Sequence, residues 1–522
     1  MPAKRASKKS SGGGASKSAR KAAPSSRAAK KPAGGKSAAK NTSGKKPGAR
    51  KGAAGKKGAA KRTGAPKVLA PGDIMIVNMI PRSMSNETHQ DSEPHLTVNP
   101  NNPSQIVGSA FTRDPFGGPL APIYVSGDGG RTWTLEFVVP SQSSTGDITV
   151  GFSGSGQLYA GILRLPGHLR QDILRTNTPS GPTPMNVLVD RAKVDQPFVQ
   201  ATTVGARDRV YVGNNDFTAT GGRTATIEQS TDAARPTPAF TKVRIEARGT
   251  GNAGQDGPQV RPVCHRDGTV YAIFYGWRAF NDGNNEVTAD VVVVRDDLGG
   301  TGATPFRSLR DPGDGLVGRR VAQGVRFIWD DTLGQQRMGG DVSIATDPRN
   351  SGTVYAAWGD VRPGTGYTLH VRRSTDRGVT WSPSDIRSIA KATNPSLAVN
   401  SQGVVGLLYQ QVVGAGAGAR WVTQLDRSLD GVNWSNLVLA RVPASSPLPQ
   451  FQPYIGDYDH LVSVGRDFLG IFSANNTPDR NHFPNGVTYQ RNHDFTTRRL
   501  LANNNTTQVG VSIDPFFFKV SG

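Results

Sequence analysis

The sequence of 522 residues has little cysteine and little histidine: one cysteine, Cys264, and eight histidines. A single cysteine excludes disulfide bonds within the chain and any metal site built from several thiolates. The histidines form no His-Glu-x-x-His motif and show no paired spacing typical of a zinc site. The sequence therefore predicts neither a metal nor another cofactor.

Long apolar segments are also missing. The N-terminal end has no apolar core of about 7 to 15 residues behind its basic start, which a secretory signal requires. No stretch reaches the roughly 18 apolar residues of a membrane-spanning helix. We therefore expect no membrane span, no export through an N-terminal signal and a cytoplasmic location.

Residues 1–67 lack acidic residues altogether, and they lack Val, Leu, Ile and aromatic residues. They contain 16 Lys and 5 Arg, whereas residues 68–522 contain 41 basic and 40 acidic residues. A segment without apolar side chains cannot offset its chain entropy by burial, so we expect residues 1–67 to form a disordered tail. Nearly all of the net charge of the protein belongs to this tail.

The composition of the tail, rich in Lys, Ala, Ser, Gly and Pro, resembles that of linker histone tails and of Lys-rich bacterial nucleoid proteins. Such a charge density suits a polyanion, either nucleic acid or an acidic polysaccharide, and an anionic lipid surface would satisfy it equally. The alternative is a solubilising extension without a partner.

In residues 68–522 one pattern recurs seven times: an apolar run, a short Asn/Gly/Asp turn and a second apolar run. The copies begin at Pro94, Ile148, Gln196, Pro258, Asp341, Pro395 and Tyr454. Each copy predicts a β-hairpin, and in most copies a third run follows and leads into a further turn. Four short strands per unit, repeated about every 50 residues, predict an all-β fold, a β-propeller of seven four-stranded antiparallel blades, with six blades as the alternative. We assign residues 299–320, in the longer gap between the fourth and fifth copies, to a large inserted loop.

Three of these units contain a turn with the pattern Ser-x-Asp-x-Gly-x-Thr-Trp. It is intact at residues 126–133 and 374–381 and one residue short at 428–434. The pattern resembles the Asp-box, or BNR repeat, of the sialidase superfamily of propellers, and the resemblance covers most of residues 74–520.

Each residue type of this pattern stabilises the turn or its contact with a neighbouring sheet. The serine hydroxyl and the aspartate carboxylate can accept hydrogen bonds from backbone N–H groups of the turn. Gly130 and Gly378 permit a positive φ, and Trp133 and its counterparts can wedge between neighbouring sheets. We therefore interpret the aspartates of these turns as scaffolding rather than as catalytic groups.

The resemblance to sialidases also implies site residues. Members of that family bind a sugar carboxylate with an Arg cluster and use an Asp as acid/base and a Tyr as nucleophile. The segment "AFTRD" matches the family segment that carries an Arg and the acid/base, which gives Arg113 and Asp114. The segment "YDHLVSVGRDFLGIF" matches the region of the nucleophile, which gives Tyr458. The implied activity is exo-hydrolysis of terminal acidic sugars.

Other candidate ligand-binding residues lie where a second strand ends or a first strand begins. In a propeller these positions converge on one face around the axis, where ligands bind. The candidates for substrate binding are Arg113, Asp216, Arg261, Trp277, Arg278, Asp360, Arg362, Tyr454 and Asp457.

Two alternatives remain open at this point. The sequence has no Glu that can be paired with Tyr458 and no Arg-Ile-Pro element at the start of the repeats, which favours a non-catalytic propeller that binds a glycan or a protein and is tethered by its tail. A further alternative is a hydrolase that attacks a neutral polysaccharide with two carboxylates, such as Asp216 with Asp360.

Overall fold

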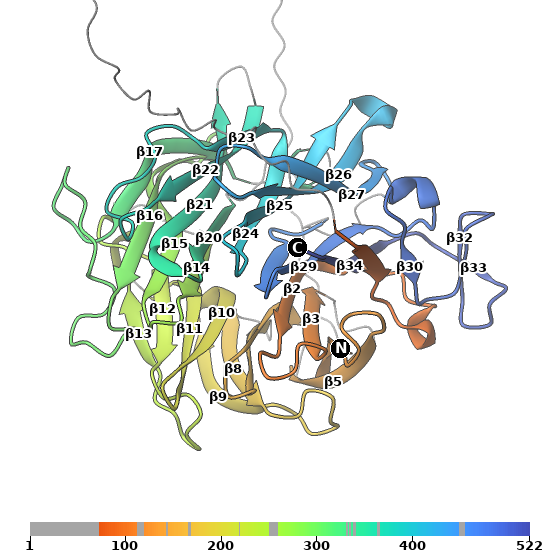
Figure 1. The fold of residues 1–522 in the computed structure, drawn as a ribbon, viewed down its shortest axis with the longest axis horizontal. Coiled ribbons are helices and arrows are strands. Elements are labelled where there is room, and N and C mark those ends of the chain that lie inside the picture. The colour runs from red at the N-terminus through yellow and green to blue at the C-terminus, as the bar shows by residue number, and fades with distance from the viewer. Residues whose placement is uncertain are drawn as a thin grey trace, which may run out of the picture. The chain divides into compact units, whose positions relative to one another are not determined.

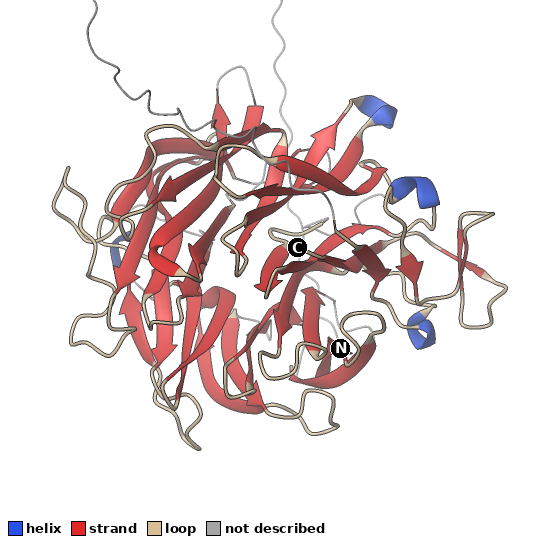
Figure 2. Cartoon of the chain, in the orientation of Figure 1, coloured by secondary structure: helices blue, strands red, loops and turns tan. Residues whose placement is uncertain are grey.

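A computed structural model describes residues 72–111, 120–141, 145–164, 169–218, 220–249, 259–329, 332–333, 336–337, 341–362, 366–447 and 455–522. These residues are mostly β-strands, as Figure 2 shows, with four 3-10 helices: η1 (Arg82–Met84), η2 (Thr220–Gly222), η3 (Gly416–Gly418) and η4 (Arg480–His482). Within this described part, no helix is long and apolar enough to cross a membrane. The predicted tail and its boundary at residue 67 lie outside the described residues and stay predictions.

Seven sheets, antiparallel except for the β1–β30 pair of the seventh, succeed one another around a common axis, which confirms the seven-bladed propeller (Figure 1). Blade one consists of β2 (Ser92–Val98), β3 (Ile106–Phe111), β4 (Leu120–Ser126) and β5 (Thr134–Pro140). Blade two consists of β6 (Thr145–Phe152), β7 (Leu158–Arg164), β8 (Arg170–Thr176) and β9 (Asn186–Ala192). Blade three consists of β10 (Val194–Val204), β11 (Arg207–Asp216), β12 (Ala225–Ser230) and β13 (Thr241–Arg244). Blade four consists of β14 (Val260–Cys264), β15 (Val270–Asn281), β16 (Glu286–Asp296) and β17 (Arg319–Ile328). Blade five consists of β20 (Val342–Asp347), β21 (Asn350–Arg362), β22 (Gly366–Ser374) and β23 (Arg387–Ala390). Blade six consists of β24 (Ala392–Val399), β25 (Val405–Val413), β26 (Arg420–Ser428) and β27 (Ser435–Pro443). In each blade the first strand is innermost.

Blade seven takes strands from both ends of the described chain. Its order is β28 (His460–Val464), β29 (Asp467–Asn475), β34 (Ile513–Val520), β1 (Ile74–Asn78) and β30 (Thr488–Tyr489). The N-terminal strand β1 pairs antiparallel with the C-terminal strand β34, from Ile74 opposite Val520 to Asn78 opposite Phe516. Two small sheets lie outside the blades: β18 (Thr332–Leu333) with β19 (Gln336–Arg337), and β31 (His493–Asp494), β32 (Arg499–Leu501) and β33 (Gln508–Val509).

Side chains join the innermost strands of neighbouring blades. The inner edge of each first strand has no strand beside it, so its backbone N–H groups need other acceptors. The backbone N–H of Val150 donates to His95 Nδ1 of blade one (3.3 Å), and that of Leu461 donates to Ser396 Oγ of blade six (2.9 Å). Comparable bonds are Val199 to Thr149, Val342 to Gln259 and Leu397 to Ser343. These bonds hold the ring together around its axis.

The inserted loop predicted between the fourth and fifth copies lies within blade four. Residues 297–318 connect β16 to β17, and β17 completes the fourth blade by pairing with β16. The predicted bounds, 299–320, include the first two residues of β17, which pairs with two register shifts and leaves Gln323 and Arg326 exposed, so that it lacks the alternation expected of a strand.

The Ser-x-Asp turns have the hydrogen bonds that their sequence predicts. Each turn connects the third strand of a blade to the fourth. In the first turn, Ser126 Oγ accepts from the N–H of Gly130 (2.9 Å), and Asp128 accepts from the N–H groups of Arg131 and Thr132 (3.0 Å each). The second and third turns repeat the serine bond to Gly378 and Gly431 at 2.8 Å. Their aspartates shape the turn, as scaffolding residues should.

The first of these turns also packs against another blade. Gly130 has φ +90°, and a Cβ built on it would overlap the ring of Phe517 in blade seven. The ring of Trp133 is buried with its centroid 5.3 Å from that of Phe517, and its Nε1 donates to Gly130 O (3.0 Å). Only glycine combines this conformation with this close approach.

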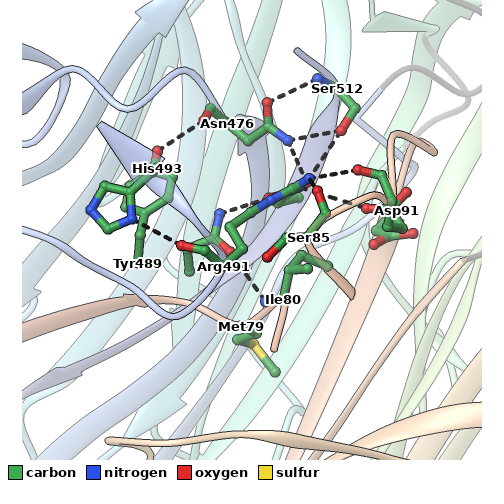
Figure 3. Close-up of polar contacts among 12 residues, drawn as sticks. Met79, Ile80, Ser85, Asp91, Asn476, Tyr489, Arg491, His493 and Ser512 are labelled. Carbon is green, nitrogen blue, oxygen red and sulfur yellow. Dashed lines mark hydrogen bonds and ion pairs between the residues drawn. The ribbon is translucent and has the colours of Figure 1, made fainter. Parts of the chain in front are cut away.

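A buried ion pair joins the N-terminal segment to blade seven (Figure 3). Arg491 is fully buried and its Nη1 donates to Asp514 (2.9 and 3.1 Å), while Asn78 Nδ2 donates to the same carboxylate (2.7 Å). Arg491 Nη2 donates to the carbonyl oxygens of Ser85 (3.1 Å) and Glu87 (2.5 Å). Since Asn78, Ser85 and Glu87 belong to the N-terminal segment, these contacts close the ring.

Candidate ligand site on the propeller axis

Each innermost strand is entered through a polar residue at the same position. His95, Thr149, Ser343 and Ser396 occupy equivalent positions on their strands, and each side chain accepts a hydrogen bond from a backbone N–H of the next blade. The polar residue lies two positions before these four residues, and two positions before their counterparts in the other three blades. We call the seven residues the entry ring: Glu93, Asp147, Gln196, Gln259, Asp341, Asn394 and Tyr458. All but Gln196 are buried. The ring lies on the loop face, which carries the connections from second to third strands and between blades.

The segment that leads into blade seven crosses the entry ring. Gln259 of blade four donates to Asp457 O (2.8 Å), and Asn394 of blade six donates to Gly456 O (3.1 Å). The N–H of Asp457 donates to Glu93 of blade one (3.3 Å). One short segment thus contacts three other blades, and it closes the axis toward the loop face.

Tyr458 and Arg261 form the centre of this closed end. The hydroxyl of Tyr458 donates to Asp147 of blade two (3.1 Å). The guanidinium of Arg261 lies 4.3 Å from the ring centroid of Phe198 and 5.0 Å from that of Tyr458. Burial, Asp147 and Glu93 raise the pKa of Tyr458 well above its ordinary value, so the phenol keeps its proton at neutral pH.

Below this centre lies an axial cavity of about 430 Å³. Tyr458, Arg261 and Phe198 line its closed end, and Arg266, Pro348 and Ser463 line it at the far ends of the inner strands. Arg266 is exposed and Ser463 half-buried, so the cavity opens on the turn face, the side of the turns between first and second strands. Its volume lies within the roughly 300–1,000 Å³ typical of small-molecule sites.

Two stacked histidines line the cavity beside Arg261. The rings of His95 and His460 lie 3.7 Å apart between centroids. Burial lowers the pKa of His460 to about 4 and lowers that of His95 well below its ordinary value, and Arg261 adds to both effects. Both imidazoles are therefore neutral at pH 7. His460 Nδ1 lies 2.8 Å from Leu96 O and 3.3 Å from Leu96 N, so its role as donor or acceptor depends on the tautomer.

The structure brings together three of the predicted site residues: Arg261, Asp457 and Tyr458. Three others, Arg113, Asp114 and Tyr454, lie outside the described residues, and their roles stay predictions.

The remaining predicted residues form ion pairs, hydrogen bonds or ring contacts within their own blades or with the adjacent connection. Asp216 is buried and 2.6 Å from Lys242 Nζ. Arg278 pairs with Glu246 (3.2 Å) and Asp290 (3.0 Å). Of the arginine candidates for substrate binding, Arg261 lies on the axis, whereas Arg278 and Arg362 pair with carboxylates of their own blades or the adjacent connections.

The last candidates also contact side chains in or next to their own blades. Trp277 is buried against Phe280, Phe327 and Trp329. Asp360 is 2.8 Å from His370 Nε2 and 3.5 Å from Arg362, all within blade five. Asp216 of blade three and Asp360 of blade five are therefore not paired with each other.

Asp147, the acidic partner of Tyr458, was not among the predicted site residues, because the resemblance to sialidases implied a Glu as that partner. A signal was present: the dipeptide Gly-Asp stands just before or at the start of the first strand in three blades, as Gly146-Asp147, Gly340-Asp341 and Gly456-Asp457. Asp147 and Asp341 belong to the entry ring and Asp457 stands one residue before the ring position of Tyr458, so the dipeptide marked three carboxylates near the axis. In the part of the chain that the structure describes, no group of three His, Cys, Asp or Glu side chains is arranged to hold a metal ion.

Comparison with known proteins yields matches among solved structures only. No family model and no curated protein matches the chain. The alpha-L-arabinofuranosidase of Fusarium graminearum in complex with arabinobiose matches with 12% identity and a TM-score of 0.40, over 84% of this chain and 97% of that chain. A leech intramolecular trans-sialidase matches with 13% identity and a TM-score of 0.38, over 66% and 67%. The SapL1 lectin in complex with alpha methyl fucoside matches with 10% identity and a TM-score of 0.38, over 70% and 100%.

Proposed function

We propose that this chain is a carbohydrate-binding propeller whose site is the axial cavity. The observation that carries the proposal is a cavity of ligand size that ends on two aromatic side chains, Phe198 and Tyr458, and a buried Arg261. Aromatic faces suit the C–H faces of sugars, and hydroxyl and imidazole groups suit their hydroxyls. The resemblance of the Ser-x-Asp turns to sialidase-superfamily propellers supports the same class of ligand.

The test is a screen of the full chain against immobilised neutral and acidic glycans. We expect saturable binding to a subset of them that free sugar competes away. Failure of a folded protein to bind any glycan would reject the proposal.

Hydrolysis of a terminal acidic sugar is a second candidate, favoured by one observation. The hydrogen bond between Tyr458 and Asp147 gives the predicted nucleophile an acidic partner that can take its proton. If this candidate is right, the wild type turns over a fluorogenic sialoside and Tyr458→Phe loses at least about 100-fold in kcat. Equal background signals from both proteins would exclude it. We rank it second because burial holds the phenol in its protonated form.

The tail supplies the second part of the proposed function, the binding of a polyanion. Its 21 positive charges are followed by a nearly neutral body, so retention on heparin or DNA should depend on the tail. We expect the full chain to elute at several-fold higher salt than residues 68–522 do. The two proteins are compared on one column over a salt gradient. Equal elution would leave the tail as a solubilising extension.

A further inference from the structure

The axial cavity is closed toward the loop face and open toward the turn face. Side chains of three other blades hold the segment of Gly456 and Asp457 across the loop-face end. At the other end the lining side chains are exposed or half-buried, as Arg266 and Val263 are. A ligand therefore enters from the turn face, and the group that it inserts first meets the side chains of the closed end.

Arg261, at the closed end, is a buried cation without a hydrogen-bond acceptor. It is 4% exposed, and no hydrogen bond or ion pair joins its guanidinium to another residue of the described chain; its Nη2 is fully buried. Its contacts at this end are the rings of Phe198 and Tyr458, whose centroids lie 4.3 and 5.0 Å away. A guanidinium has five N–H donors, and burial of a charged group without partners costs free energy. Arg261 thus offers a positive charge and unused donors to a group in the cavity.

His95 supplies a second unused donor beside Arg261. Its Nδ1 accepts from the backbone N–H of Val150 (3.3 Å), so in the neutral imidazole the proton is on Nε2. This Nε2 is buried and has no acceptor in the part of the chain that the structure describes. The rings of His95 and Phe198 meet edge to face with their centroids 4.8 Å apart, and Arg261 lies over the same phenylalanine. The two donors therefore contact one aromatic ring at the lining of the cavity.

The carboxylates near Arg261 limit the charge that a bound group can carry. Asp147, Asp457 and Glu93 act on Arg261 electrostatically, but none of them forms an ion pair with it in the described chain. Asp147 and Glu93 already accept hydrogen bonds from other groups. Asp459 also lines the cavity, where burial raises its pKa well above its ordinary value. A group with one negative charge can pair with Arg261, whereas a phosphate dianion would meet more repulsion from these neighbours.

From this closure and these unused donors we infer that the axial cavity binds an acidic sugar by its carboxylate, inserted from the turn face. Arg261 pairs with the carboxylate, and His95 Nε2 donates to it, since charge-assisted hydrogen bonds of this kind are the strong ones. The inference rests on the proposed function and narrows it to sugars that carry a carboxylate. It differs from the site that the resemblance to sialidases implies, which lies on the loop face and binds the carboxylate with an Arg cluster.

The test is isothermal calorimetry on the full chain at pH 7, with pairs of methyl glycosides that differ only in the acid group. The pairs are glucuronide with glucoside and galacturonide with galactoside. Inorganic phosphate and the methyl glycoside of N-acetylneuraminic acid are further probes. The site variants are Arg261→Met, which removes the cation, and Arg261→Lys, which keeps it. The basic tail is the same in every protein, so its attraction for acids does not distinguish between them.

A second pair of variants tests the entrance and leaves the buried site unchanged. Arg266→Glu reverses an exposed charge that lines the mouth, in the turn between the first and second strands of blade four. Its matched control is Arg207→Glu, which reverses an exposed charge at the corresponding turn of blade three, outside the lining of the cavity. This pair keeps the inference testable should Arg261→Met unfold.

We expect at least one acid to bind about tenfold or more tightly than its neutral counterpart. Arg261→Met should remove this preference, and Arg261→Lys should keep part of it. Arg266→Glu should weaken binding of the acid about two- to fivefold, and Arg207→Glu should leave it within a factor of about two.

Equal binding of acids and their neutral counterparts would overturn the inference and leave the proposed function standing. Acid binding that neither Arg261→Met nor Arg266→Glu weakens would place the site elsewhere and overturn the inference as well. Tighter binding of phosphate than of any acidic sugar would overturn the assignment to a carboxylate. Binding of no sugar at all, in agreement with a negative glycan screen, would reject the proposed function itself.

Discussion

Replacement of Arg491 by methionine is expected to lower the free energy of unfolding of the propeller by about 3–5 kcal/mol. Arg491 is fully buried and is the cation that faces Asp514 and Glu87 in the contact between the N-terminal segment and blade seven. Methionine keeps much of the volume but leaves both carboxylates without their cation. Burial and the neighbouring Glu87 and Asp514 already raise the pKa of Asp91 well above its ordinary value, so this region has little capacity for further negative charge.

The measurement is urea-induced unfolding of the full chain, followed by the fluorescence of its tryptophans. The matched control is Arg498→Met, because Arg498 pairs with Asp479 at 3.3 Å but its side chain is 59% exposed. An exposed pair contributes about 0–1 kcal/mol, so this variant should stay close to the wild type. A loss at Arg491 no larger than that at Arg498 would show that the buried pair does not close the ring.

Substitution of Gly130 by alanine is expected to cost about 2–5 kcal/mol, the second largest effect. The left-handed conformation at φ +90° costs a residue with a Cβ about 1–2 kcal/mol, and displacement of the Phe517 ring adds about 1–3 kcal/mol of overpacking. Both costs act on the contact between blades one and seven. The same unfolding experiment measures the effect.

Gly205 provides the comparison for this substitution. It has φ +64°, but no atom lies within 4 Å of a Cβ built there, so Gly205→Ala bears only the backbone cost. The difference between the two variants therefore isolates the packing against Phe517. Equal losses would mean that the ring of Phe517 moves aside freely and that the first Ser-x-Asp turn does not hold the two blades together.

The fold could be predicted from the sequence because its signals are local. A hairpin and a Ser-x-Asp turn are each formed within about 20 residues of sequence, and seven hairpin copies in a row define seven blades. Gly130, Gly378 and Trp133 have the conformations and contacts that their motif implies. The large inserted loop was also predicted, and only its end was placed two residues inside β17, because that strand lacks the alternation of polar and apolar residues.

The candidate site could be predicted only in part, because it depends on how distant strands align around the axis. Tyr458 and Arg261 were identified as single residues, but their contact with Phe198 joins blades seven, four and three. The partner of Tyr458, Asp147, is 311 positions away in the sequence. Arg278 and Arg362 satisfied the same sequence criterion as Arg261, yet carboxylates on nearby strands and turns hold them elsewhere.

The pairing of β1 with β34 has a consequence for how the protein is made on the ribosome. The first described strand to emerge has its partner in the last described one, and the bond between Asn78 and Asp514 spans 436 positions. Until β34 has been synthesised, β1 lacks this neighbour. Closure of so long a loop is slow compared with hairpin formation, although its entropic cost grows only with the logarithm of its length. We therefore expect the pairing of β1 with β34 to be a late step of folding, and a truncation that removes either strand leaves six finished blades and an open seventh.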